Sequence, residues 1–432
     1  MSVTAAVITV FLVCLFLSVP ISVSLLFSAL TAAFVNPRLT CDALFAFRTL
    51  VTGLDTFVLI AIPLFILSGN LMAKGGISDK LFRLFAFFLG NKTAGMPWAV
   101  IISCFFYSMM TGSGAATVAA MGAMTIPLLT SLGYEKTFIT ALVAVAGGLG
   151  VITPPSIPYI VYGQASNTSI GDLFIAGIIP GIVVAVFLMI GTYIYCRKSG
   201  EDKEKLNANY MVLKKLGLWK VFKDSFLGLL CPVIILGGIY SGITTPTEAA
   251  CISVFYALFV SVFVYKTIKW KEVGKILADS VASLVTMLII AASATVFARV
   301  LSMIQAPQHL ASFILTAITS KIVLLLVINV FLLFIGLSID SVSAILICTP
   351  IFLPMITAAG INPVHFGIVM TVNLAIGFVT PPVGVNLFIA SALTGIPAMT
   401  IAKDSVKFII WFLAALMVIT FIPALTLVFV HH

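Results

Sequence analysis

The sequence predicts an all-α polytopic membrane protein, and three observations support this fold class. Of the 432 residues, 61% are hydrophobic and 9% are charged, whereas a soluble domain carries about 25% charged residues to cover its surface. The mean hydropathy is +1.24. Because each helical crossing takes about 20 apolar residues, the chain has room for roughly ten to twelve membrane helices. This composition excludes a soluble enzyme, a nucleic-acid-binding protein and a disordered chain.

The N-terminal segment is expected to be a retained helical region. It is apolar and its first arginine is Arg38, so it lacks the basic leader of a cleaved signal peptide. Residues 1–34 fit either one long helix or two short helices separated near Pro20, and no charge decides between them. At the other end of the chain, His431 and His432 are expected to be a tag remnant.

The remaining apolar segments are of two kinds. Six are continuous and are expected to cross as simple helices: 54–72, 172–196, 226–241, 247–265, 276–300 and 405–430. Four contain Gly, Ser, Thr and Pro at the depth where lipid would surround them: 96–129, 138–163, 323–356 and 366–393. Broken backbone at that depth is tolerated only where it packs in protein or lines a cavity. We therefore expect the four broken segments to surround a site.

Charge predicts the orientation of these segments. The net charge is +9, and the polar stretch 197–224 holds eight of the 23 Lys and Arg residues. Positive loops stay cytoplasmic, so the excess charge indicates topology rather than an acidic partner. Counting from this stretch also puts the lysines of 266–275 and 403–407 inside. Segment 96–129 is then a hairpin that opens to the cytoplasm, and segment 323–356 is one that opens to the outside.

Two hairpins of opposite orientation, each followed by a broken helix, predict an inverted repeat. The first copy reads "SMMTGSGAATVAAMGAMTIPLL" and then "GGLGVITPPSIPYIVYG"; the second reads "FIGLSIDSVSAILICTPIFLPMI" and then "LAIGFVTPPVGVNLFIA". Each proline of the two Thr-Pro-Pro breaks removes a backbone donor and leaves nearby carbonyls free. Free carbonyls suit a cation that has lost its water, and the N-termini of half-helices suit an anionic group.

At these residues the sequence resembles the large membrane (permease) subunit of a tripartite ATP-independent periplasmic (TRAP) transporter, of DctM type. The resemblance covers nearly the whole chain and includes "PLFILSGNLM" at 63–72, "GITTPTEAA" at 242–250, "IQAPQHLA" at 304–311 and "GINPVHFGI" at 360–368. It implies a scaffold domain and a mobile transport domain with two re-entrant hairpins, elevator-type motion and sodium ions near the hairpin tips. It also implies sodium-coupled import of a small organic acid, such as a C4-dicarboxylate, sialic acid or another carboxylate.

The resemblance also implies site residues at the tips and the breaks. The first sodium site would take Gly112, Ser113, Gly114, Thr153, Pro154 and Ser156, and the second would take Ser338, Asp340, Thr380, Pro381, Gly384 and Asn386. The substrate would lie between the tips and contact Gly112, Ala115, Pro155, Ser338 and Pro382. Arg299 is a further substrate candidate because its planar fork suits a carboxylate, although its place near the interface favours snorkelling.

The implied organisation alternates scaffold and transport segments. It comprises N-terminal scaffold helices at 1–92, a first repeat at 93–171, scaffold helices at 172–320 with a cytoplasmic loop at 197–224, a second repeat at 321–400 and a C-terminal helix at 401–432. The expected partners are membrane lipids, a small four-helix membrane subunit of DctQ type and a soluble periplasmic substrate-binding protein, the last two as separate chains. The expected location is the bacterial inner membrane.

Several residues have a structural explanation beside the functional one. The small residues of the first tip could serve close helix packing, and Asp340 could be the N-cap of a helix that begins near Ser341. If desolvated, Asp340 could also titrate, so proton coupling stays open beside sodium coupling. Glu248 is expected to be structural, because a carboxylate suits the first turn of a helix. For Asn70, packing and a bond to the transport domain are equally compatible with the sequence.

Enzyme chemistry is not expected. The sequence contains no P-loop, no HExxH and no Ser/His/Asp constellation, so energy must come from a gradient. The seven cysteines are dispersed without a CxxC pair, which disfavours a redox or metal role. Two rival interpretations remain at this stage: a binding-protein-independent anion symporter or antiporter of related fold, and a membrane subunit that transports nothing itself.

Overall fold

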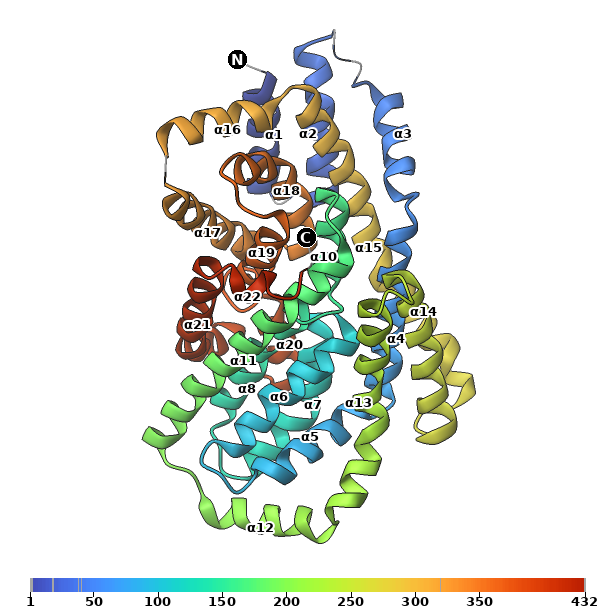
Figure 1. Ribbon diagram of the computed structural model, residues 1–432, viewed down its shortest axis with the longest axis vertical. Helices are drawn as coiled ribbons and strands as arrows, with labels where there is room; N and C mark the ends of the chain where they lie inside the picture. The colour runs from blue at the N-terminus through green and yellow to red at the C-terminus, as the bar shows by residue number, and fades with distance from the viewer. Residues whose placement is uncertain (1–2, 18, 38, 40, 319, 431–432) are drawn as a thin grey trace.

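The computed structural model describes residues 3–17, 19–37, 39, 41–318 and 320–430, so Arg38, His431 and His432 lie outside the described residues. Within these ranges every regular element is a helix, and ten helices are long and apolar enough to cross a membrane. Figure 1 shows an elongated bundle with α12 at one end and α1 and α16 at the other. The prediction of an all-α polytopic membrane protein is confirmed.

The N-terminal segment forms two short helices, which decides the alternative that the sequence left open. They are α1 (Val3–Phe16) and α2 (Ile21–Val35), and α2 begins directly after Pro20. A proline just ahead of a helix is favourable because its missing N–H has no partner to lose there. Both helices pack on each other, and α2 also packs on the long helix α15.

Further helices continue this predicted scaffold. They are α3 (Ala43–Leu54), η1 (Phe57–Ile60), α4 (Ala61–Lys74), α5 (Ile77–Leu89), α13 (Leu218–Tyr240), α14 (Pro246–Phe259) with η2 (Val260–Val264), α15 (Trp270–Met303) and α16 (Ala306–Ala317). Helices α3 and α4 pack against α15, and α4 packs against α14. Asn70 donates from Nδ2 to Ser280 Oγ of α15 at 2.8 Å. Its bond therefore stays within the predicted scaffold rather than reaching the repeats.

The predicted cytoplasmic loop at 197–224 is mostly helical. It contains the end of α11, helix α12 (Lys203–Lys215) and the start of α13. Asp202 caps α12 by accepting a hydrogen bond from Lys205 N at 3.2 Å. The stretch was predicted to be a loop because it has no apolar pattern. Local capping and helix-forming residues suffice to make it helical.

The first repeat has the predicted hairpin and broken helix. The hairpin is α6 (Gly95–Thr111) and α7 (Gly114–Ser131), and the broken helix is α8 (Lys136–Ala146), α9 (Leu149–Ile152) and α10 (Ile157–Ser166). The 30-residue helix α11 (Ile170–Ser199) follows. Helix α11 packs against α6, α19 and α21 more than against α13. Its neighbours are thus mainly repeat elements, although the sequence analysis grouped it with the scaffold.

The second repeat has the same order of elements. Its hairpin is α17 (Lys321–Ser338) and α18 (Ser341–Ala358), and its broken helix is α19 (Pro363–Gly377) and α20 (Val385–Thr394). Helices α21 (Ala398–Phe421) and α22 (Ala424–Leu427) complete the described chain. The predicted helix at 405–430 therefore begins earlier than expected and is interrupted before Pro423, where the ring cannot continue a helix.

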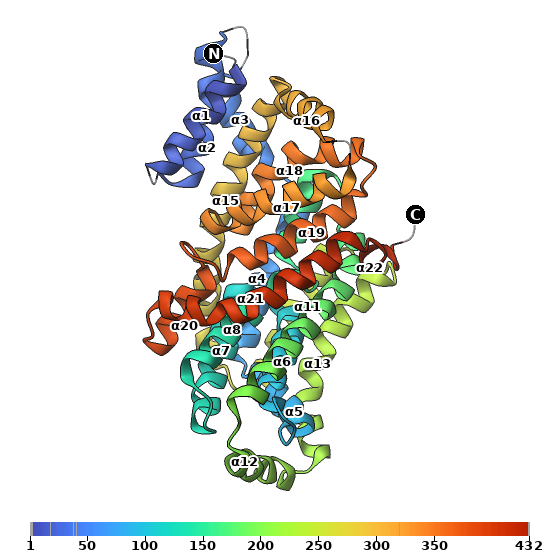
Figure 2. The same ribbon diagram turned by 90° about the vertical axis from the view of Figure 1, so that its left-hand side faces the viewer.

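The two repeats interlock through their broken helices. Helix α10 of the first repeat packs against α18 of the second, while α20 of the second packs against α7 and α8 of the first. Figure 2 shows α19 of the second repeat and the C-terminal helix α21 beside α11, with α20 reaching to α7 and α8. One large apolar core runs through both repeats. Each repeat therefore contributes residues to the surroundings of the other repeat's hairpin.

Candidate cation and substrate site

The first hairpin turns over at a two-residue tip. Gly112 ends α6 with a φ of +58°, and Ser113 is the N-cap of α7. A left-handed residue at the end of a helix is usually glycine because glycine has no Cβ to clash. The Ser113 Oγ accepts a hydrogen bond from Ala116 N at 3.4 Å, and the Ser113 carbonyl accepts one from Thr117 Oγ1 at 2.9 Å. The tip thus presents backbone and hydroxyl oxygens.

The first tip lies directly on the first helix break. Ile157 N donates to the Gly112 carbonyl at 3.4 Å, and the hydroxyls of Ser108 and Thr153 share a hydrogen bond. A Cβ on Gly150 would lie 2.5 Å from the Ser113 carbonyl oxygen, so only glycine permits this approach. Thr153 and Ser156 are fully buried. The structure therefore brings together the residues that were predicted for the first sodium site.

Asn386 of α20, predicted for the second sodium site, contacts the first repeat near its tip. Its Nδ2 donates to the Ala144 carbonyl at 3.0 Å, and a Cβ on Gly114 would lie 3.5 Å from its Oδ1. Asn386 is fully buried, and this Oδ1 has no hydrogen-bond partner. Asn386 reaches the first repeat because α20 packs against α7 and α8, a contact that local sequence patterns do not encode.

The second tip has an acidic cap. Helix α17 ends at Ser338, and Asp340 caps α18 by accepting hydrogen bonds from Ser343 N at 3.1 Å and from Ser343 Oγ at 2.5 Å. The structural explanation for Asp340 as an N-cap is confirmed. Its role at an ion site stays a prediction. Asp340 could cap α18 and bind an ion at the same time, because a carboxylate has two oxygens with several acceptor positions.

The second tip also lies on its helix break. Val383 N donates to the Leu337 carbonyl at 3.3 Å, and a Cβ on Gly377 would lie 2.3 Å from the Gly336 carbonyl oxygen. Pro381 and Pro382 are joined by a cis peptide bond, as are Pro154 and Pro155. The tip of each hairpin therefore packs against the broken helix of its own repeat.

The second site is more open than the first. Ser338 and Pro382 are exposed, whereas Asp340, Thr380 and Pro381 are half-buried. Thr380 Oγ1 donates to the Ile376 carbonyl at 2.7 Å, and the buried Gly384 has a φ of +39° at the start of α20. The residues predicted for the second site are therefore more accessible at the protein surface than those of the enclosed first site.

Sequence reasoning missed Asn373. This buried residue of α19 lies one turn before Gly377, and its Nδ2 donates to Asn329 Oδ1 at 2.6 Å. Its own Oδ1 has no hydrogen-bond partner. A buried amide oxygen without a donor is costly unless something satisfies it. The available signal was an asparagine within the apolar run 366–379.

The predicted substrate residues fall into two groups. Gly112 and Pro155 are buried at the first tip, and Ala115 is half-buried in the first turn of α7. Ser338 and Pro382 are at the second tip and break. Arg299 is not among the tip residues; it lines a cavity between α15 and the helices α10 and α18.

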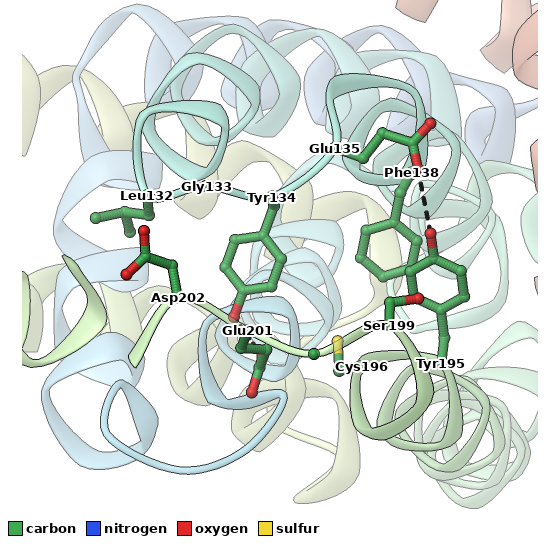
Figure 3. A pocket seen from close by; sticks show the side chains of 11 residues that line it. Leu132, Gly133, Tyr134, Glu135, Phe138, Tyr195, Cys196, Ser199, Glu201 and Asp202 are labelled. Atoms are coloured by element: carbon green, nitrogen blue, oxygen red, sulfur yellow. Dashed lines mark hydrogen bonds between the residues drawn. The ribbon is translucent and has the colours of Figure 1, made fainter. Parts of the chain in front are cut away.

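A separate cavity of about 280 Å³ lies where the α7–α8 loop meets the α11–α12 link. Figure 3 shows Tyr134 directed at Glu201 and Glu135 bonded to Tyr195. Glu201 accepts hydrogen bonds from Tyr134 Oη at 2.6 Å and from Ala94 N at 3.0 Å. Burial, followed by the bond to Glu201, raises the pKa of Tyr134. These contacts tie the α11–α12 link to both open ends of the first hairpin.

Histidine and cysteine form no metal centre in the described residues, where no group of three His, Cys, Asp or Glu side chains could hold an ion. His365 is buried in α19, and its ring nitrogens contact Thr426 Oγ1 at 2.8 Å and the Thr420 carbonyl at 3.2 Å. This histidine is therefore a packed structural residue.

Inverted hairpins, tips on broken helices and oxygen-lined sites define an integral membrane transporter subunit. The chain resembles the Alcanivorax borkumensis YdaH transporter with a TM-score of 0.62 at 17% identity, covering 89% of this chain and 90% of that one. It resembles Neisseria gonorrhoeae MtrF with a TM-score of 0.60 at 18% identity, covering 87% and 83%. At these identities the likeness concerns the fold alone.

Residues 8–425 match the family described as "Tripartite ATP-independent periplasmic transporter, DctM component". The chain belongs to this family. It is thus a transporter subunit rather than an enzyme, and a multi-pass protein of the bacterial inner membrane.

Relatives in this family are named for different anions. The chain is 36% identical to the sialic acid TRAP transporter large permease protein SiaM of Vibrio cholerae, covering 96% of this chain and 95% of that one. It is 40% identical to the C4-dicarboxylate protein DctM of Pseudomonas aeruginosa, covering 86% of each. It is also 40% identical to the isethionate permease protein DctMQ of Oleidesulfovibrio alaskensis, covering 96% of this chain but 64% of that protein.

Proposed function

We propose that this chain imports a small organic anion into the cell, driven by sodium, as the large permease subunit of a TRAP system. A periplasmic binding protein delivers the anion, and a small membrane subunit accompanies the chain. Membrane lipids surround the assembly. In this proposal the two repeats form the transport domain, which moves past the scaffold in an elevator-type step.

The observation that carries the proposal is the oxygen-rich junction of the first tip with its helix break. The junction combines the carbonyls of Gly112 and Ser113 with the unpartnered Oδ1 of Asn386. Unwound carbonyls at helix breaks coordinate sodium in transporters of inverted-repeat design. A bound cation would satisfy the Asn386 oxygen, which otherwise is buried at a cost of about 1–3 kcal/mol.

The second tip supplies a carboxylate instead of a neutral amide. The carboxylate oxygens of Asp340 would serve as ligands of a sodium ion, because hard cations prefer oxygen ligands. With both sites occupied, the positive charge of the ions and the N-termini of α7 and α18 offsets the charge of a carboxylate or sulfonate held between the tips. The names of the relatives support the class of substrate, since sialic acid, C4-dicarboxylates and isethionate are all organic anions.

The test is uptake into proteoliposomes that hold this chain and its small subunit, with the binding protein outside. Radiolabelled isethionate, succinate and sialic acid are offered with and without an inward sodium gradient. We expect one of them to accumulate only with both sodium and the binding protein. Ser113→Ala and Asp340→Asn should each raise the sodium concentration that gives half-maximal uptake.

The other outcomes separate the rival functions. Uptake that follows a pH gradient and ignores sodium would assign coupling to protons, with Asp340 as the leading carrier. Uptake without a binding protein would favour an independent symporter or antiporter. No gradient-driven uptake of any probe, with correctly assembled subunits, would favour a membrane subunit that does not transport.

A further inference from the structure

A second cavity lies between the predicted scaffold and the repeats. It has a volume of about 610 Å³. Its scaffold wall comes from α3, η1 and α15, and its opposite wall comes from α10 and α18, which belong to different repeats. The cavity is thus bounded by the two parts that would move relative to each other in the proposed transport step.

One face of α15 lines this cavity with small side chains and a single cation. The lining residues of α15 are Ala291, Ala294, Thr295, Ala298, Arg299, Ser302 and Met303. Their spacing of three and four residues places them on one side of a helix. The alanine side chains are small and leave space beside this face of α15. The long Arg299 side chain is the largest polar group on the same face.

Arg299 has the properties of an anion-binding group. No acidic side chain lines the cavity among the described residues, and no ion pair found in the described part of the chain includes Arg299. A guanidinium offers a planar fork that matches a carboxylate or sulfonate. Gln164 and Asn167 of the α10 region add amide groups to the lining.

The cavity lies toward the outside and near the second tip. Helix α15 carries Lys271 and Lys275 of the predicted cytoplasmic lysines at its start, and Arg299 is about one turn from its other end at Met303. The α18 residues Leu346 and Pro350 also line the cavity. Since Asp340 caps that same helix, Leu346 lies about 9 Å along α18 from the second tip.

We propose that this cavity is an outer anion-binding vestibule in which Arg299 binds the carboxylate or sulfonate of the substrate before it reaches the tips. The inference rests on the proposed transport function and deepens it by adding a separate capture site. Arg299 acts there as a specificity-determining residue for an anionic group. The apolar wall, which includes Phe45, Leu59 and Leu346, accommodates the remainder of a small organic acid.

Snorkelling is the alternative explanation for Arg299, and the two explanations predict different behaviour of a lysine. An interfacial anchor needs only a long side chain with a charged end, so Arg299→Lys would restore wild-type properties. A bidentate anion site needs the fork, so lysine would restore binding only in part. Arg299→Gln removes the charge in either case.

The experiment measures initial uptake in the proteoliposome system at increasing concentrations of the loaded binding protein, with isethionate, succinate and sialic acid as probes. We expect Arg299→Gln to raise the apparent KM roughly tenfold or more and to leave the sodium dependence unchanged. Arg299→Lys should fall between Gln and wild type. Lys271→Gln, an exposed change at the cytoplasmic start of α15, is the matched control and should have no effect.

A second variant tests the cavity without touching the charge. Ala298→Leu narrows the vestibule and should also raise the apparent KM, so the proposal remains testable if Arg299→Gln fails to assemble. Melting temperature and copurification of the small subunit report assembly for each variant. An unchanged KM in both assembled variants, or full rescue by lysine, would overturn the proposal. If wild type itself shows no uptake with sodium and binding protein, the proposed function fails instead.

Discussion

Gly150 and Gly377 occupy equivalent positions in the two repeats, and each is the place where a broken helix contacts the backbone of a hairpin tip. Gly150 faces the Ser113 carbonyl, and Gly377 faces the Gly336 carbonyl. Asp340 precedes Gly377 along the chain by as many residues as Ser113 precedes Gly150. The duplicated design therefore includes the packing of each tip as well as its sequence motif.

An alanine at either glycine should disrupt the site. A Cβ on Gly150 or Gly377 would lie 2.5 or 2.3 Å from a carbonyl oxygen, so the backbone of the tip must shift. Gly150→Ala and Gly377→Ala should each cost about 1–3 kcal/mol of stability and should lower uptake. Gly237→Ala is the control, because nothing lies within 4 Å of its added Cβ. Thermal unfolding and uptake by all three variants check the prediction; equal behaviour would contradict it.

Asn386→Ala should weaken sodium activation. The substitution removes the unpartnered Oδ1 at the first tip together with the Nδ2 bond to the Ala144 carbonyl. We expect the sodium concentration for half-maximal uptake to rise about tenfold, which corresponds to about 1.4 kcal/mol. Thr394→Ala, at the other end of α20, serves as the control. A lower melting temperature with an unchanged sodium requirement would instead make Asn386 a structural residue only.

Glu248 should contribute to stability and not to transport. Its Oε2 accepts a hydrogen bond from Thr245 N at 2.7 Å, while Thr245 Oγ1 accepts one from Glu248 N at 3.3 Å. This capping box confirms the structural role predicted for Glu248. Glu248→Ala should lower the melting temperature, because the cap is lost, and should leave the apparent KM unchanged. Glu248→Gln retains an acceptor and should lose less.

The start of α12 should be sensitive to acid. The bond from the Lys205 backbone N–H, followed by the Lys205 side chain, lowers the pKa of Asp202. A lowered pKa in the folded state means that the cap is fully effective above the ordinary carboxyl pKa and is lost as the pH falls through the lowered value. The hydrogen-exchange protection factors of residues 203–207 should therefore fall in acid. In Asp202→Asn, which still caps, this pH dependence should be absent.

Local sequence patterns predict much of the fold. The hairpin tips follow from small residues between apolar runs, and the breaks follow from Thr-Pro-Pro, where a missing N–H ends helical bonding. The cap at Asp340 and the capping box at Glu248 were also foreseeable, because caps involve residues three positions apart. By contrast, the helix α12 was missed because its polar sequence carries no apolar face of sufficient length.

The candidate site was only partly foreseeable. The residues of the first tip and its break meet as predicted, since both lie within one repeat. Asn386 joins them from the second repeat, and Asn373 gained significance only when its buried Oδ1 proved to have no partner. Neither fact depends on neighbours in the sequence, so an analysis by motif and spacing does not reveal it.

The sequence by itself determined the membrane class, the two inverted repeats and the positions of the tips and breaks, because hydropathy, proline and capping act over a few residues. The tertiary structure decided that α10 and α20 each pack against the other repeat, that α11 packs against elements of both repeats, and that Arg299 lines a cavity between the predicted scaffold and the repeats. These relationships join segments far apart in the chain. They depend on how whole helices pack, and packing is a property of complementary surfaces rather than of any local pattern.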